Sequence, residues 1–94
     1  MEKVFEIKKG KRREIPAATH KDGSGRLQTV SKEANPLYYQ LIQKFEKLTG
    51  IPILLNTSFN VQGEPIVCSP SDAVRTFYAC GLDVLIIGPF VICK

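Results

Sequence analysis

One helix and two strands are predicted by residues 69–93, SPSDAVRTFYACGLDVLIIGPFVIC. Ser69 is suited to cap the helix, because its hydroxyl can accept a hydrogen bond from an unpaired N–H of the first turn. Pro70 suits the first helical position, where no N–H is needed. The carboxylate of Asp72 complements the helix dipole three residues after the cap. We therefore expect a helix from residue 70 that Gly81 ends.

Three residues of this helix share one face: Ala73, Phe77 and Cys80. Residues 83–87 and 90–93 are apolar and are separated by a Gly-Pro pair, which predicts two strands joined by a tight turn. The helix is expected to cover the sheet that these strands enter.

A second helix is predicted between Asn35-Pro36, a cap followed by a first-turn proline, and Gly50, a left-handed end. Four apolar residues at helical spacing form a stripe that we expect to face a sheet: Leu37, Leu41, Phe45 and Leu48. The run IPILL at 51–55 then predicts a central strand that is buried on both faces.

The first third of the chain is predicted to be rich in strands. Residues 4–7 alternate, residues 15–16 begin an extended stretch, and residues 26–30 alternate after the turn DGSG at 22–25. The predicted order is β-β-β-α-β-α-β-β. Residues 1–94 are therefore expected to form one domain of the mixed α/β (α+β) class, with helices covering a sheet.

Composition and charge exclude several classes of protein. Hydrophobic residues make up 44% and charged residues 23% of the chain, which is typical of a globular domain and not of a disordered one. No apolar run reaches the roughly 18 residues of a membrane helix, and the N-terminus lacks the zones of a secretory signal. A cytoplasmic location is expected.

The net charge of +4 is concentrated near the start, where the run KKGKRR at 8–13 suggests contact with phosphate or nucleic acid. The plain alternative is a solvated loop. Cys68, Cys80 and Cys93 form no C-x-x-C pair and are expected to stay reduced. Because His20 is the sole histidine, no multi-histidine metal site can be built.

Two clusters carry the candidate site residues. The loop NTSFNVQGEP at 56–65 follows the predicted buried strand, and ligands of open α/β sheets bind beyond strand carboxyl ends. Its amides, hydroxyls and glycine suit phosphate and ribose, although they equally suit a loop that satisfies its own backbone. The second cluster holds His20 and Arg26, whose planar guanidinium can grip an oxyanion with two hydrogen bonds.

Two segments resemble the C-terminal region of the NodU/CmcH carbamoyltransferases: residues 15–30, IPAATHKDGSGRLQTV, and residues 54–67, LLNTSFNVQGEPIV. The similarity continues through residues 69–73 and 81–83, so it spans nearly the whole chain. The loop at 56–63 is also similar to a nucleotide-binding loop of YrdC proteins.

The resemblance implies a partial YrdC-like twisted mixed sheet with two covering helices, from an O-carbamoyltransferase. In that family this region converts carbamoyl phosphate and ATP, with Mg²⁺, into carbamoyl adenylate for transfer to a hydroxyl acceptor. The family's metal site lies in an N-terminal ASKHA-type domain that this chain lacks. The chain is therefore expected to be a fragment that is inactive alone and that pairs with the missing domain.

The resemblance also implies residue roles. Arg26 is expected to be catalytic, holding phosphate or carbamoyl oxygens. One departure is Gln62, where many relatives carry arginine or lysine. The substrate- and nucleotide-binding residues are expected to be His20, Arg26, Asn56, Thr57, Ser58, Asn60, Gly63 and Glu64.

Two other functions stay open at this point. The basic run would suit an RNA- or nucleic-acid-binding module with a YrdC-like fold, although no aromatic residue interrupts it to stack on bases. The chain could instead be a structural fragment without a ligand of its own. For the carbamoyltransferase fragment, the missing half of the YrdC-like sheet is expected to leave an exposed strand edge that favours homo-oligomers.

Overall fold

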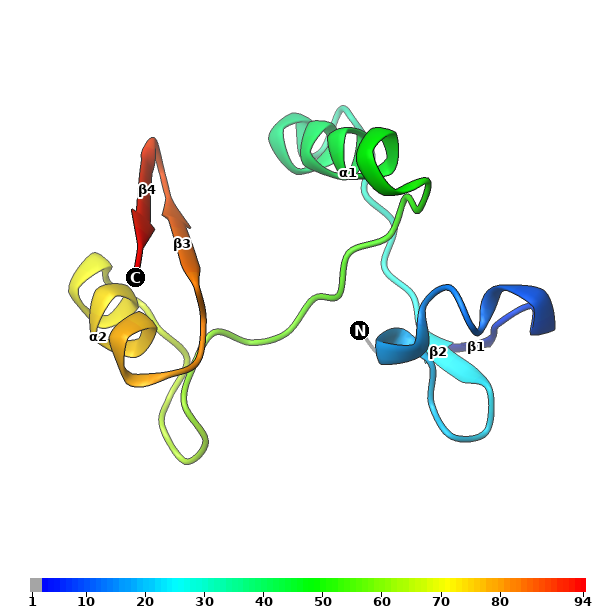
Figure 1. Cartoon of the computed structure of the whole chain (residues 1–94), viewed down its shortest axis with the longest axis horizontal. Helices are drawn as coiled ribbons and strands as arrows, with labels where there is room; N and C mark the ends of the chain where they lie inside the picture. The colour runs from blue at the N-terminus through cyan, green and yellow to red at the C-terminus, as the bar shows by residue number, and fades with distance from the viewer. Residues whose placement is uncertain (1–2) are drawn as a thin grey trace. The chain divides into compact units, whose positions relative to one another are not determined.

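The computed structural model describes residues 3–94 and divides the chain into two compact units, residues 1–55 and residues 56–94. The N-terminal unit holds β1 (Val4–Glu6), β2 (Ser24–Arg26) and α1 (Pro36–Thr49). The C-terminal unit holds α2 (Pro70–Ala79), β3 (Val84–Ile87) and β4 (Phe90–Cys93), and Figure 1 labels all six elements. None of the helices in the described part of the chain is long and apolar enough to cross a membrane.

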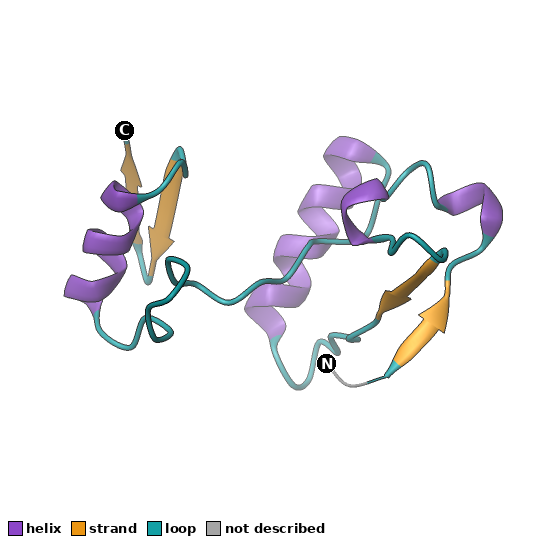
Figure 2. Cartoon of the chain, turned by 90° about the horizontal axis from the view of Figure 1, so that it is seen from below, coloured by secondary structure: helices purple, strands orange, loops and turns teal. Residues whose placement is uncertain are grey.

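In the N-terminal unit, β1 and β2 form a two-stranded antiparallel sheet in which Phe5 lies opposite Gly25. Figure 2 shows the two strands side by side, with short helical turns in the connection between them. These turns are 3₁₀ helices, η1 (Lys9–Lys11) and η2 (Pro16–Ala18).

The turn that leads into β2 depends on two glycines. Gly23 has φ 85°, a conformation that side chains with a Cβ seldom adopt. A Cβ on Gly25 would lie only 2.9 Å from the carbonyl oxygen of Ala18 and 2.8 Å from Cδ1 of Ile7. The backbone of β2 can therefore pack against the preceding loop only because position 25 has no side chain.

The ends of α1 agree with the sequence prediction. The N–H of Tyr38 donates to Oδ1 of Asn35 (3.1 Å), and Gly50 adopts the left-handed conformation with φ 77°. The expected apolar stripe is wrong at three of its four positions, because Leu37 is 79%, Leu41 49% and Leu48 86% exposed.

The half-buried side of α1 is shifted by one position. It contains Tyr38, Ile42 and Phe45, which are also spaced four and three residues apart. The helix therefore carries two overlapping apolar lines, and hydrophobic spacing alone cannot tell which one packs.

In the C-terminal unit, β3 and β4 form an antiparallel hairpin joined by Gly88-Pro89, with Ile87 opposite Phe90, as predicted. Gly88 has φ 56°, the positive value that two-residue hairpin turns require. The cap of α2 is also confirmed, because the N–H of Asp72 donates to Oγ of Ser69 (3.2 Å).

The core of this unit is small. Ala73, Phe77 and Leu85 are buried, which confirms the predicted face of α2 and its packing on β3. Cys80 is only half-buried, and the sequence analysis missed Thr76, which is buried on the same helix. The helix ends at Ala79, two residues before the predicted stop at Gly81, because Cys80 turns extended, with φ −127°.

The mixed α+β class is confirmed, but the element order β-β-β-α-β-α-β-β is wrong in detail. Residues 51–55 form no strand, and Leu55 is 60% exposed. A buried strand needs neighbours that take up its backbone hydrogen bonds, and no described strand pairs with this segment.

Two further strand predictions fail. Residues 15–16 enter η2, since proline favours the first turn of a helix and has no N–H for a ladder. Residues 27–30 lie beyond β2, whose partner β1 has only three residues. The described strands form two separate two-stranded antiparallel sheets instead of one mixed sheet.

Asp72 provides a pH-dependent test of α2. The pKa of its carboxyl is lowered, mainly by the hydrogen bond from the Ser69 hydroxyl (2.5 Å) and also by the charge of Arg75 at 3.2 Å. A carboxyl whose pKa is lower in the folded than in the unfolded protein stabilises the fold at pH values above its unfolded-state pKa of about 3.9. This stabilisation is lost as the pH falls through the folded-state pKa.

We therefore expect the carboxyl ¹³C signal of Asp72 to titrate below the ordinary aspartate range. In Ser69→Ala its midpoint should rise towards that range, whereas Ser71→Ala, which removes an exposed neighbouring hydroxyl, should leave it unchanged. Equal titration midpoints of Asp72 in the unmodified chain, Ser69→Ala and Ser71→Ala would show that the Ser69 hydroxyl does not lower its pKa.

Candidate functional site

The loop that contains most of the predicted binding residues folds back on itself. The N–H of Val67 donates to the carbonyl of Phe59 (2.9 Å), and the N–H of Glu64 donates to the carbonyl of Val61 (3.0 Å). The second bond closes a β-turn whose third residue, Gly63, has φ 85°. The positive φ that the turn requires thus explains why residue 63 is a glycine.

Asn60 acts on the same turn. Its Nδ2 donates to the carbonyl of Glu64 (2.9 Å) and to the carbonyl of Val61 (3.3 Å). The amide of Asn60 therefore stabilises the loop, which is the structural alternative considered for this segment. Asn60, Gly63 and Glu64 lie together in the turn.

Three predicted binding residues precede the turn: Asn56, Thr57 and Ser58 are exposed and belong to neither a helix nor a strand. They do not follow a strand end as expected, because residues 51–55 form no strand. This loop therefore does not lie beyond the carboxyl end of a strand, which is where ligands of open α/β sheets bind. The binding roles of these residues stay predictions.

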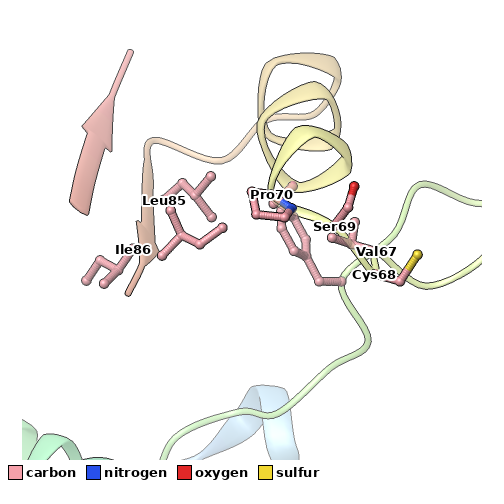
Figure 3. Close-up of a pocket in the computed structure, with 9 residues that line it drawn as sticks. Val67, Cys68, Ser69, Pro70, Leu85 and Ile86 are labelled. Carbon is pink, nitrogen blue, oxygen red and sulfur yellow. The ribbon is translucent and has the colours of Figure 1, made fainter. Parts of the chain in front are cut away.

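The C-terminal unit has a pocket of about 340 Å³ beside this loop, shown in Figure 3. Its polar lining is sparse, because the Oγ of Ser69 already bonds Asp72 and the only other polar side chain is Cys68, whose Sγ lies 3.7 Å from Oδ2 of Asp72. None of the predicted binding residues lines it. The lining residues are Phe59, Val67, Cys68, Ser69, Pro70, Ala73, Leu85, Ile86 and Ile87.

An apolar pocket of this kind suits hydrophobic groups and not phosphates. No sequence pattern predicted this pocket. The available signal was the apolar character of Phe59, Val67 and residues 85–87. This signal indicates a core face and does not show that the face is partly open.

The second cluster lies in the N-terminal unit. Oγ of Ser24 donates to Oδ1 of Asp22 (2.6 Å), and Nδ1 of His20 lies 3.0 Å from the same Oγ. Arg26, at the end of β2, is exposed. Because Ser24 and Arg26 are two residues apart in one strand, their side chains share a face of the sheet.

The basic run at 8–13 is partly neutralised by its surroundings. Nζ of Lys11 lies 2.9 Å from the carboxylate of Glu14. Arg12 donates from Nε to the carbonyl of Ile7 (2.9 Å) and pairs with Glu6 at 3.2 Å. Two of the run's cations therefore have structural partners, which weakens the case for a nucleic-acid surface.

Candidate metal ligands do not gather into a cluster within the described residues 3–94. No group of three or more histidine, cysteine, aspartate or glutamate residues in that range is arranged to hold a metal ion. The three cysteines are free thiols.

Gly63 permits a direct test of the loop. A Cβ at this position would meet nothing within 4 Å, so the cost of a substitution comes from the positive φ alone. We expect Gly63→Val to destabilise the turn by about 1–2 kcal/mol, and Gly63→Asn to cost less, because asparagine tolerates this conformation. Urea unfolding followed by circular dichroism measures both free energies of unfolding. Equal losses in the two variants would show that the positive φ is not the cause.

Comparison with known proteins gives the chain's relationships. The family model for the carbamoyltransferase C-terminus matches residues 1–94. An uncharacterized protein of Synechocystis sp. is 52% identical over 99% of the chain, and nodulation protein NolO of Bradyrhizobium diazoefficiens is 50% identical over 97%. The 3'-hydroxymethylcephem-O-carbamoyltransferase of Amycolatopsis lactamdurans is 38% identical over 79%.

The chain spans only 15%, 17% and 14% of these three relatives, respectively. The family match, in contrast, covers every residue of the chain. It includes both segments on which the resemblance to NodU/CmcH proteins rests, residues 15–30 and 54–67. The chain belongs to the carbamoyltransferase C-terminal family.

Proposed function

We propose that this chain is the C-terminal part of an O-carbamoyltransferase and that it binds ATP and carbamoyl phosphate to form carbamoyl adenylate. The observation that carries the proposal is the family match over residues 1–94. One relative is named as an O-carbamoyltransferase. Because the proposed reaction consumes ATP, we also propose a cytoplasmic location.

The proposed reaction has two balanced steps. Hydrolysis of carbamoyl phosphate gives carbamate and phosphate, and an oxygen of carbamate then attacks the α-phosphorus of ATP while pyrophosphate leaves. Carbamate and ATP repel one another, so a fixed cation is needed where they meet. Phosphoryl transfer otherwise requires positioning and little covalent chemistry from the protein.

Arg26 is the cation that we assign to this role. It is exposed and shares a strand face with Ser24, whereas Arg12 is held by Ile7 and Glu6. A guanidinium binds an oxyanion through two parallel hydrogen bonds and stays charged at neutral pH. The Mg²⁺ that accompanies ATP would arrive with the substrate, with the exposed carboxylate of Glu64 as a candidate contact.

The remaining binding residues belong to the loop of the C-terminal unit. Asn56, Thr57 and Ser58 offer exposed amide and hydroxyl groups for the nucleotide. Gln62, in place of a basic residue, supplies no charge there. We propose that the rest of the transferase, carrying the acceptor site, is the chain's functional partner.

A chimera tests the proposal. In the Amycolatopsis lactamdurans relative, the region homologous to this chain would be replaced by residues 1–94, and carbamoyl transfer and carbamoyl-phosphate-dependent pyrophosphate release would be measured. We expect activity in the chimera and none in the relative when that region is deleted. A folded chimera without pyrophosphate release would refute the proposal.

Self-association is a further expectation for the 94-residue chain alone. The β3–β4 hairpin has only two strands, so each strand has an edge that no described strand pairs. Ile86, Phe90 and Val91 on this hairpin are all more than 60% exposed. Such edges and apolar side chains favour pairing with a second copy.

Light scattering should therefore show dimers or larger assemblies at micromolar concentration. Ile86→Lys, which puts a charge on the exposed face, should shift the protein towards monomer. A strict monomer in the unmodified chain would contradict this expectation.

A further inference from the structure

Three side chains beside β2 form a continuous hydrogen-bonded chain. The carboxylate of Asp22 accepts two hydrogen bonds on Oδ1, from the N–H of Ser24 (2.9 Å) and from its Oγ (2.6 Å). Oγ of Ser24 in turn lies 3.0 Å from Nδ1 of His20. These bonds lower the pKa of Asp22, with the Ser24 hydroxyl as the largest cause, so the carboxylate stays ionised near neutral pH.

The direction of these bonds determines which nitrogen of His20 carries the proton. An ionised carboxylate can only accept, so the single hydroxyl proton of Ser24 is committed to Asp22. Oγ of Ser24 is then left as an acceptor towards the imidazole. Nδ1 must therefore be the N–H donor, and in the neutral ring the lone pair lies on Nε2.

The backbone holds this arrangement in place. The N–H of His20 donates to the carbonyl of Ser24 (2.7 Å), and the N–H of Gly23 donates to the carbonyl of His20 (2.9 Å). Both partners of the imidazole contact are thus fixed by the same tight turn. Arg26 follows Ser24 by two residues in β2, so its side chain leaves the strand on the same face as that of Ser24.

We propose that Asp22 and Ser24 are positioning residues that keep His20 in the Nδ1-protonated form, so that Nε2 accepts a hydrogen bond from the amide N–H of a carbamoyl group whose anionic part is held by Arg26. The choice of a carbamoyl ligand rests on the proposed function. The tautomer does not, because it follows from the hydrogen bonds alone.

This arrangement distinguishes a carbamoyl group from an acetyl group. The two have similar shapes, but the methyl group of acetyl has no N–H to donate. The acetyl analogue therefore lacks the hydrogen bond between the carbamoyl N–H and Nε2 and is expected to bind more weakly by the worth of that bond. Asp22 and Ser24 would thus contribute to substrate selectivity without touching the substrate.

The tautomer is measured first, on the 94-residue chain. Because His20 is the only histidine, its ring ¹⁵N signals need no assignment. At a pH where the ring is neutral, long-range ¹H–¹⁵N spectra should show a protonated Nδ1. Ser24→Ala and Asp22→Asn should shift the ring towards the Nε2-protonated form, and Ser31→Ala, at a hydroxyl outside the cluster, should not.

The ligand is tested with two stable phosphonates that differ only in one group: phosphonoacetamide, which carries the amide, and 2-oxopropylphosphonate, which carries a methyl group instead. Titration should show that the unmodified chain prefers phosphonoacetamide by about two- to tenfold, the usual worth of one hydrogen bond. The preference should disappear in Ser24→Ala, while Ser31→Ala retains it.

The outcomes separate the two claims. A ring protonated on Nε2 in the unmodified chain would overturn the whole proposal. The expected tautomer with equal or no binding of the two phosphonates would overturn the assignment of the carbamoyl ligand. An inactive chimera with both results as expected would instead refute the proposed reaction and leave the role of Asp22 and Ser24 intact.

Discussion

Phe77→Ala is expected to cost the C-terminal unit about 3–5 kcal/mol, the usual loss when a fully buried phenylalanine is truncated. The side chain is 0% exposed and lies at the centre of a core with only two other buried apolar residues, Ala73 and Leu85. Its ring also contacts Tyr78 edge-to-face, at 5.2 Å between centroids, and Lys94, whose Nζ lies 4.8 Å from the ring centre.

Urea unfolding followed by circular dichroism measures this loss, with Phe90→Ala as the matched control. Phe90 is the same residue type on β4 but is 68% exposed, so its truncation should cost less than about 1 kcal/mol. Similar losses in the two variants would show that Phe77 is not the centre of this core.

Arg26→Lys is expected to reduce kcat/KM of the active chimera for carbamoyl phosphate by about ten- to a hundredfold. The estimate corresponds to the loss of one charge-assisted hydrogen bond, about 1.5–3 kcal/mol. Lysine keeps the charge but cannot present two parallel N–H donors. Because Arg26 is exposed at the end of β2, the free energy of unfolding should hardly change.

The matched control is Arg13→Lys, an exposed arginine in the basic run. Its activity should equal that of the unmodified chimera. Full activity in Arg26→Lys would show that Arg26 does not hold the oxyanion. A loss of RNA binding in Arg13→Lys with unchanged transfer would instead favour a nucleic-acid role for the run.

Both helix N-termini and the C-terminal end of α1 were predictable from sequence because their causes are local. Asn35 and Ser69 cap N–H groups three residues away, and Gly50 supplies a left-handed φ without steric cost. The hairpin of β3 and β4 was predictable for the same reason, since its two-residue turn is set by Gly88. Such contacts span a few residues, so the neighbouring sequence is sufficient.

The family was also evident from sequence, through two long segments that a model of the family matches together with the rest of the chain. The candidate site was less predictable. In the loop, Asn60 hydrogen-bonds the backbone and Gly63 provides the positive φ of the turn. The composition of the loop cannot distinguish these structural roles from ligand binding. The direction of the hydrogen bonds around Ser24 likewise became visible only in three dimensions.

The sequence by itself determined the helices, their caps, the C-terminal hairpin and the family. Only the tertiary structure decided that residues 51–55 are not a strand, and that Tyr38 and Ile42 pack where Leu37 and Leu48 do not. Strand formation and burial depend on partners distant in the chain, which supply backbone hydrogen bonds and apolar contacts. A run of apolar residues has the same intrinsic preference for a strand whether or not such a partner is present. Its own sequence therefore cannot reveal whether it will pair as a buried strand.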